Sequence, residues 1–201
     1  MGDYTLYQPL TRTDRATVLL YRSGIALTCL LLAVAAVFVA VSPAAVAGGF
    51  PSFYFDLFLA LLYLASGLSV LFIHLYIGSF KRKLIGLYII SLAALAALFI
   101  KGGGDAFSFV SREPAAALLF LPLAGCIGFV AAKEAFCFRL AEGYLLAISM
   151  PLYLAAFSTG GMGKTGIESG FLLIAALYAL FTFRKIFMPL HCDIGDKSAY
   201  R

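Results

Sequence analysis

Charged residues are scarce in this sequence. Asp, Glu, Lys and Arg make up 12% of the 201 residues, and 63% are hydrophobic, whereas a soluble domain carries about 25% charged residues. This number of charged residues is too small to cover a surface that faces water. We therefore expect most of the exterior to contact lipid. Tryptophan is absent, which leaves Tyr and Phe to form any aromatic belt at the membrane interface.

Cysteine and histidine are also few, and their spacing fits no common site. The four Cys and two His form no recognised metal-binding pattern. No nucleophile lies beside a base and an orienting group in the sequence, which favours a non-enzymatic protein. The stretch STGGMGKTG resembles a phosphate-binding loop, but Ser158 stands where that pattern requires glycine. We therefore expect no nucleotide partner, and without a basic soluble domain no nucleic acid either.

The abundant feature is a series of long apolar runs. Because they are continuous rather than alternating, they predict helices and not barrel strands. We expect an all-α, polytopic transmembrane bundle of about six helices, since each crossing needs about 20 apolar residues. Pro151 interrupts the short fifth run, which leaves open a re-entrant pair for the last two. The six runs are 23–41, 54–77, 84–100, 115–132, 144–158 and 167–183.

Basic residues predict the orientation of the bundle. With six crossings, twelve Lys and Arg fall on the side that holds both ends of the chain, and three fall on the other side. Positive charge stays in the cytoplasm, so we expect both termini there. The chain is then one integral membrane domain, 1–201, with a cytoplasmic segment 1–20, a bundle over 23–183 and a cytoplasmic tail 184–201. The expected location is a bacterial inner membrane or a thylakoid.

Small residues recur four positions apart in several runs, for example Ala65 with Ser69 and Ala124 with Gly128. This spacing lets helix backbones approach closely in lipid. At the first run, Thr11 or Thr13 could cap a helix that begins near Asp14. Both patterns favour a packed bundle.

Two groups of residues are candidates for function. His74 is the one histidine inside an apolar run, where an imidazole can ligate haem iron or chlorophyll magnesium, or hydrogen-bond a neighbouring helix. The second group gathers on the expected cytoplasmic side, where we expect it to contact a partner protein. It comprises Arg22, Lys81, Arg82, Lys133, Glu134, Cys137, Asp193, Asp196 and Lys197.

Four short motifs resemble a known family. They are YRSG at 21–24, IHLY at 73–76, KEAFCF at 133–138 and DIGDKS at 193–198. In order and spacing they are similar to a family of cyanobacterial and plastid integral membrane proteins catalogued only as a domain of unknown function. The resemblance implies a membrane of an oxygenic phototroph and no known catalytic residues.

These observations lead to three hypotheses. The first is a non-enzymatic accessory, assembly or regulatory protein of a photosynthetic membrane complex, with complex subunits or a second copy of the chain as partners. The second is a small-solute or ion transporter. The third is a protein that binds chlorophyll or haem through His74.

Overall fold

The computed structural model describes residues 10–41 and 52–194, and this part of the chain is helical, without a strand. Six spans in it are long and apolar enough to cross a membrane, which confirms the expected helical membrane fold. The helices are α1 (Arg12–Val41), α3 (Ser52–Phe72), α4 (Gly78–Gly102), α5 (Ala106–Arg112), the 3-10 helix η1 (Pro114–Phe120), α6 (Leu121–Phe138), α7 (Ala141–Ser158), α8 (Lys164–Ile186) and α9 (His191–Ile194). The fourth span combines η1 and α6.

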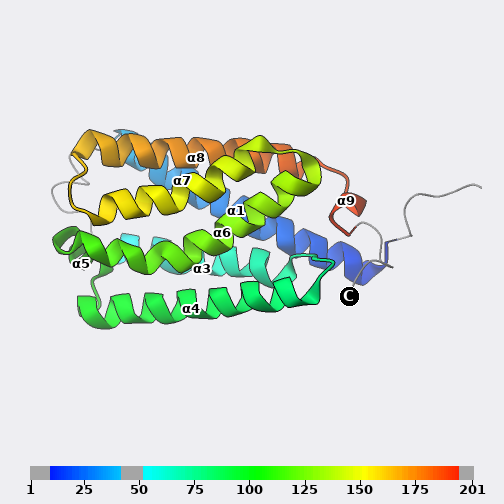
Figure 1. The fold of residues 1–201 in the computed structure, drawn as a ribbon, viewed down its shortest axis with the longest axis horizontal. Coiled ribbons are helices and arrows are strands. Elements are labelled where there is room, and N and C mark those ends of the chain that lie inside the picture. Colours follow the sequence, from blue (N-terminus) through cyan, green and yellow to red (C-terminus); the bar gives the residue numbers. More distant parts are fainter. Residues whose placement is uncertain (1–9, 42–51, 195–201) are drawn as a thin grey trace, which may run out of the picture.

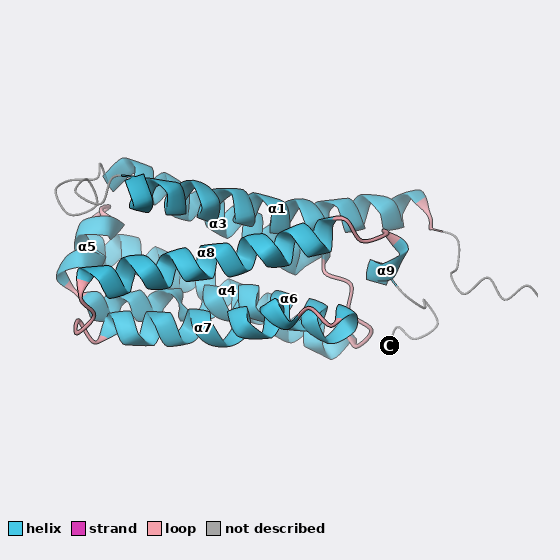
Figure 2. Ribbon diagram, turned by 90° about the horizontal axis from the view of Figure 1, so that it is seen from above, coloured by secondary structure: helices cyan, strands magenta, loops and turns pink. Residues whose placement is uncertain are grey.

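The spanning helices lie side by side along the long axis of the molecule (Figure 1). α1 packs against α3 and α8, α7 packs against α6 and α8, and α4 packs mainly on α6. Figure 2 shows α1 and α8 from above, with α9 beyond the end of α8. The short helices α5 and η1 cover the opposite end of the bundle.

Several helices at one end of the bundle begin or end at other residues than the sequence predicted. The second apolar run was expected to stay in one crossing to 77, but α3 ends at Phe72, so that His74 lies in the connection 73–77. The basic residues Lys81 and Arg82 lie in the first turns of α4 rather than in a loop. Likewise α6 continues to Phe138. Polar residues assigned to loops therefore extend the helices at this end.

The last two crossings are complete helices. α7 runs through Pro151 for 18 residues and α8 runs for 23 residues, so the structure does not contain the re-entrant pair that the sequence left open. Membrane helices tolerate proline because neighbouring groups satisfy the freed carbonyl.

Local sequence explains how α1 begins and where helices approach closely. Thr11 Oγ1 accepts from the Asp14 amide at 3.1 Å, and the Thr11 amide donates to Asp14 Oδ2 at 2.8 Å, which is a reciprocal N-terminal cap. A Cβ added to Gly24 would lie 2.6 Å from Ala65 O and would overlap Ser69 Oγ. The predicted small pair on α3 therefore forms the surface against which α1 packs.

Candidate functional site

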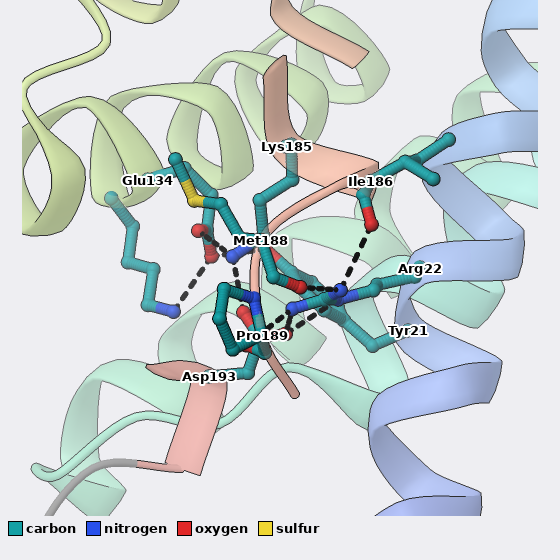
Figure 3. A network of polar contacts seen from close by, with 9 residues as sticks. Tyr21, Arg22, Glu134, Lys185, Ile186, Met188, Pro189 and Asp193 are labelled. Atoms are coloured by element: carbon teal, nitrogen blue, oxygen red, sulfur yellow. Dashed lines mark hydrogen bonds and ion pairs between the residues drawn. The ribbon is translucent and has the colours of Figure 1, made fainter. Parts of the chain in front are cut away.

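A cluster of buried ionic groups closes one end of the bundle, where α1, α4 and α7 begin and α3, α6 and α8 end (Figure 3). We call this end the network end, and the end covered by α5 and η1 the cavity end. The groups come from α1, α6, α8 and α9, which are far apart in the sequence. The charge network consists of Tyr21, Arg22, Lys133, Glu134, Lys185 and Asp193.

Arg22 holds the segment that follows α8. Its Nε donates to Asp193 Oδ2 at 2.6 Å. Nη1 donates to Ile186 O at 3.1 Å and to Met188 O at 2.5 Å, and Nη2 donates to Pro189 O at 3.0 Å. The last carbonyls of a helix lack partners within the helix. The guanidinium therefore satisfies backbone groups at the end of α8 and fixes the turn that leads into α9.

Lys185 lies at the centre of the charge network. Its side chain is fully buried, and its Nζ forms ion pairs with Glu134 Oε2 and with Asp193 Oδ1. The same ammonium lies 4.2 Å from the centroid of the Phe138 ring. A buried charge is costly unless it is paired and hydrogen-bonded. Lys185 therefore joins α8 to α6 and α9 at a point that water does not reach.

Glu134 receives two further hydrogen bonds. Tyr21 Oη donates to Glu134 Oε1 at 2.6 Å, and Lys133 Nζ donates to the same oxygen at 2.7 Å. Lys133 also lies 5.7 Å from the centroid of the Tyr21 ring. Charge-assisted bonds of this length are among the strong ones in proteins. Three cations and two carboxylates thus meet in the charge network, with Lys133 at its half-buried edge, and leave one net positive charge.

Two further polar contacts brace the network end. Arg184 Nη1 donates to both oxygens of Glu142, at 3.0 and 2.8 Å, and joins α8 to the start of α7. His74 Nε2 lies 3.2 Å from Thr17 Oγ1 and joins the connection 73–77 to α1. Burial lowers the pKa of His74, and the nearby charge of Lys133 lowers it further. His74 is thereby held neutral and in contact with α1.

The structure divides the residues that the sequence proposed for partner contact. Arg22, Glu134 and Asp193 are buried inside the charge network, so a partner could reach them only if the network opened. Lys81 and Lys133 are half-buried, whereas Arg82 and Cys137 are exposed. Asp196 and Lys197 lie outside the described residues.

Sequence reasoning missed Lys185, Tyr21 and the Arg184–Glu142 pair as site residues. Lys185 stands beside Arg184 at the end of an apolar run, where both were counted only as orientation charges. Ion pairs between different helices cannot be predicted from the spacing of residues along the sequence. The YRSG motif was the one signal for Tyr21.

The half of the bundle toward the cavity end contains a large cavity that is partly open to the surroundings. This cavity of about 550 Å³ lies among α1, α3, α6, α7 and α8 beneath α5 and η1. Its lining is mostly apolar and includes several phenylalanines, and among the residues that the structure describes it contains no Asp, Glu, Lys, Arg or His. Pockets for small molecules measure about 300–1,000 Å³. The size therefore suits a small-molecule ligand.

A second, much smaller cavity separates the large cavity from the charge network. It measures about 10 Å³ and is lined by polar groups that include Thr28, Ser66, Ser69, Cys126 and Tyr178. This is about the room that one water molecule needs. Ile127 lines both cavities, so the polar and the apolar spaces meet at this side chain.

One curated relative comes from Haemophilus influenzae and is named only as an uncharacterized protein. It is 28% identical over 203 residues, which cover 100% of this chain and 99% of the relative. Its source gives no support to the photosynthetic membrane that the resemblance implied. No solved structure matches the chain.

A family model described as an uncharacterized integral membrane protein matches residues 68–201. The match covers α4 to α9. It therefore includes Lys133, Glu134, Lys185 and Asp193 of the charge network and most of the residues that line the large cavity. It agrees with the resemblance found in the motifs, three of which fall within it. The chain therefore belongs to the DUF2301 family of integral membrane proteins.

Proposed function

We propose that this protein carries a small molecule across the membrane by exposing its cavity to one side and then to the other. The observation that carries the proposal is the contrast between the two ends of the bundle. One half contains the large cavity, and the other is closed by buried ion pairs that join four helices. Transporters bind their ligand between helices near the middle of the bilayer and open one side at a time.

Ion pairs suit an end that must open and close. When water enters, each separated charge regains its hydration, which offsets much of the interaction that is lost. An apolar contact that opens gains no such compensation. The residues with most to regain are Lys185 and Glu134, because both side chains are fully buried in the closed network. By the charge rule, this end faces the cytoplasm.

The experiment uses Cys126 as a reporter. This residue is fully buried in the small cavity between the charge network and the large one. The variant keeps Cys126 and replaces Cys29, Cys137 and Cys192 by Ala. A membrane-impermeant methanethiosulfonate reagent is then applied to one side of sealed vesicles at a time.

A carrier predicts slow modification of Cys126 from each side, because each opening is transient. Asp193→Asn should raise the rate from the network end at least tenfold and lower the rate from the cavity end. Glu168→Gln, at a half-buried residue that pairs with exposed Lys164 at the cavity end, is the matched control and should change neither rate. No reaction from the network end, or fast reaction from both sides at once as in an open pore, would contradict the proposal.

An accessory role in a membrane complex is the second candidate. It is supported by exposed residues at the end of α6, where Phe136 is 80% exposed and Cys137 is exposed beside it. Arg82 is exposed at the same end. Gentle purification from native membranes should then yield a partner that Phe136→Ala loses. Photosynthetic subunits or bound pigment in that sample would support the hypotheses drawn from the motifs and from His74; a single protein without partners or colour would end them.

A further inference from the structure

We propose that the large cavity binds an uncharged long-chain molecule, with its hydrocarbon chain in the apolar space and a hydroxyl head turned toward Ser66. This inference rests on the proposed function, because it names the class of molecule that the cavity takes. It is drawn from the chemistry of the lining, the position of the cavity and the polar groups at its inner end.

The lining that residues 10–41 and 52–194 provide consists mainly of hydrocarbon side chains and includes no charged one. Its side chains include Phe58, Leu62, Phe120, Phe157 and Phe171. A charged ligand would lose its hydration there without gaining an opposite charge, which is strongly unfavourable. Charged substrates are therefore excluded from this space.

The two hydroxyl groups among the described residues of the lining already donate hydrogen bonds. Ser111 Oγ donates to Phe107 O at 2.8 Å, and Tyr153 Oη donates to Ile167 O at 2.9 Å. A ligand with many polar groups would have to displace these bonds or remain unpaired. The main body of the ligand is therefore hydrocarbon.

The position of the cavity indicates how such a ligand arrives. Its walls are spanning helices, namely α1, α3, α6, α7 and α8. A hydrocarbon chain dissolves in the bilayer around these helices. When it enters the cavity, it leaves a fluid apolar environment for an apolar space of fixed shape. Side chains that line a hollow of this size lose dispersion contacts unless an apolar molecule fills it. Binding thus restores packing inside the bundle.

The inner end of the cavity offers a place for one polar head. Ile127 lines both this cavity and the small polar space, where Ser66 Oγ is buried and has no hydrogen-bond partner among the described residues. A buried hydroxyl without a partner is unfavourable. A ligand hydroxyl can both donate to and accept from Ser66, which explains why an alcohol fits better than a bare hydrocarbon.

The test is photolabelling in phosphatidylcholine vesicles with a long-chain alcohol that carries a diazirine. Peptides are mapped by mass spectrometry, with unlabelled hexadecanol as competitor. We expect saturable labelling of the peptides that contain Ala124 and Met150, which line the cavity. Palmitate, which carries a charged head, should compete at least tenfold less well. Labelling confined to lipid-facing residues, or not displaced by hexadecanol, would overturn the proposal.

Cavity-filling variants give the matched comparison. Ala124→Phe places a ring in the cavity and should lower saturable labelling at least tenfold, with Ala124→Leu as a milder version that retains the fold. Ala155→Phe makes the same change at an exposed position of α7 and should leave labelling unchanged. Ser66→Ala should reduce the preference for the alcohol over a hydrocarbon of equal length. Equal labelling of Ala124→Phe and Ala155→Phe would contradict the inference.

The two proposals fail in different ways, because the Cys126 experiment needs no ligand. If Cys126 reacts alternately from the two sides but the alcohol does not label the cavity, the ligand class is wrong and transport stands. If the alcohol labels the cavity but Cys126 never reacts from the network end, the cavity binds lipid without carrying it across.

Discussion

Arg22 and Asp193 lie 171 positions apart in the sequence and meet at 2.6 Å, so that the first spanning helix holds the last described turn of the chain. Asp193 also pairs with Lys185. One carboxylate therefore serves two cations on different helices. The tail residues that precede 195 are part of the bundle, not a free arm.

Removal of this carboxylate should destabilise the protein strongly. Asp193→Ala leaves the buried charge of Arg22 without a carboxylate and leaves Lys185 paired with Glu134 alone. Breaking a buried ion pair in this way costs roughly 3–5 kcal/mol. The free energy of unfolding in mixed detergent micelles measures the effect. Lys164→Ala removes the exposed partner of a 3.9 Å pair with Glu168 and should cost less than about 1 kcal/mol. Equal losses in the two variants would show that the network does not stabilise the fold.

A double-mutant cycle should detect coupling between Lys185 and Glu134. Lys185→Met alone leaves two carboxylates facing each other without their central cation. Adding Glu134→Gln removes one of those charges, so the double variant should lose less stability than the two single variants together. The expected coupling energy is about 0.5–3 kcal/mol. Strict additivity of the unfolding free energies would argue against a direct interaction.

Substitution of Gly24 by a larger residue should destabilise the protein, whereas substitution of Gly86 should be tolerated. A methyl group at Gly24 would overlap atoms of Ala65 and Ser69 on α3, and such overpacking costs about 1–3 kcal/mol. At Gly86 an added Cβ meets nothing within 4 Å. Gly86→Ala should therefore stabilise α4 by about 0.5–1 kcal/mol. Thermal unfolding of both variants tests the pair, and a stabilised Gly24→Ala would refute the close contact of α1 and α3.

His74 should make stability depend on pH below neutrality. Its folded pKa lies below the unfolded value of about 6.5 because burial and the charges of Lys133 and Lys81 disfavour the protonated form. The unfolded chain therefore binds the proton more readily. As pH falls from about 7 to about 5, the stabilising contribution of neutral His74 is lost.

The measurement is the unfolding free energy against pH in wild type and in His74→Gln. The variant should show a flatter profile over this range, while the contribution of the other titratable groups remains in both. Profiles of identical slope would mean that His74 titrates equally in the folded and unfolded chain.

The membrane fold could be predicted from the sequence because lipid leaves few options. Long apolar runs must become helices, and the six runs correspond to the six spans. Their ends were less predictable. Lys133 and Glu134 were expected beyond the fourth crossing, yet α6 continues through them to Phe138, because Lys185 and Tyr21 provide Glu134 with partners inside the bundle.

The sites were only partly predictable for the same reason. Arg22, Glu134 and Asp193 were recognised as unusual, but as surface groups rather than members of one buried network. Which charges meet depends on how helices are placed around one another, which no local spacing encodes. The cavity was even harder to predict, because the sequence does not distinguish the Phe and Leu residues that line it from those that face lipid.

The shared carboxylate of Asp193 has a consequence for biosynthesis. A ribosome makes Asp193 after all six spanning helices, so Arg22 and Lys185 enter the membrane before the group that they share exists. During this interval the nascent chain holds cations without their final counter-ion, and only the emergence of α9 completes the set. Docking of α9 onto Arg22 and Lys185 therefore follows the synthesis of all six spanning helices.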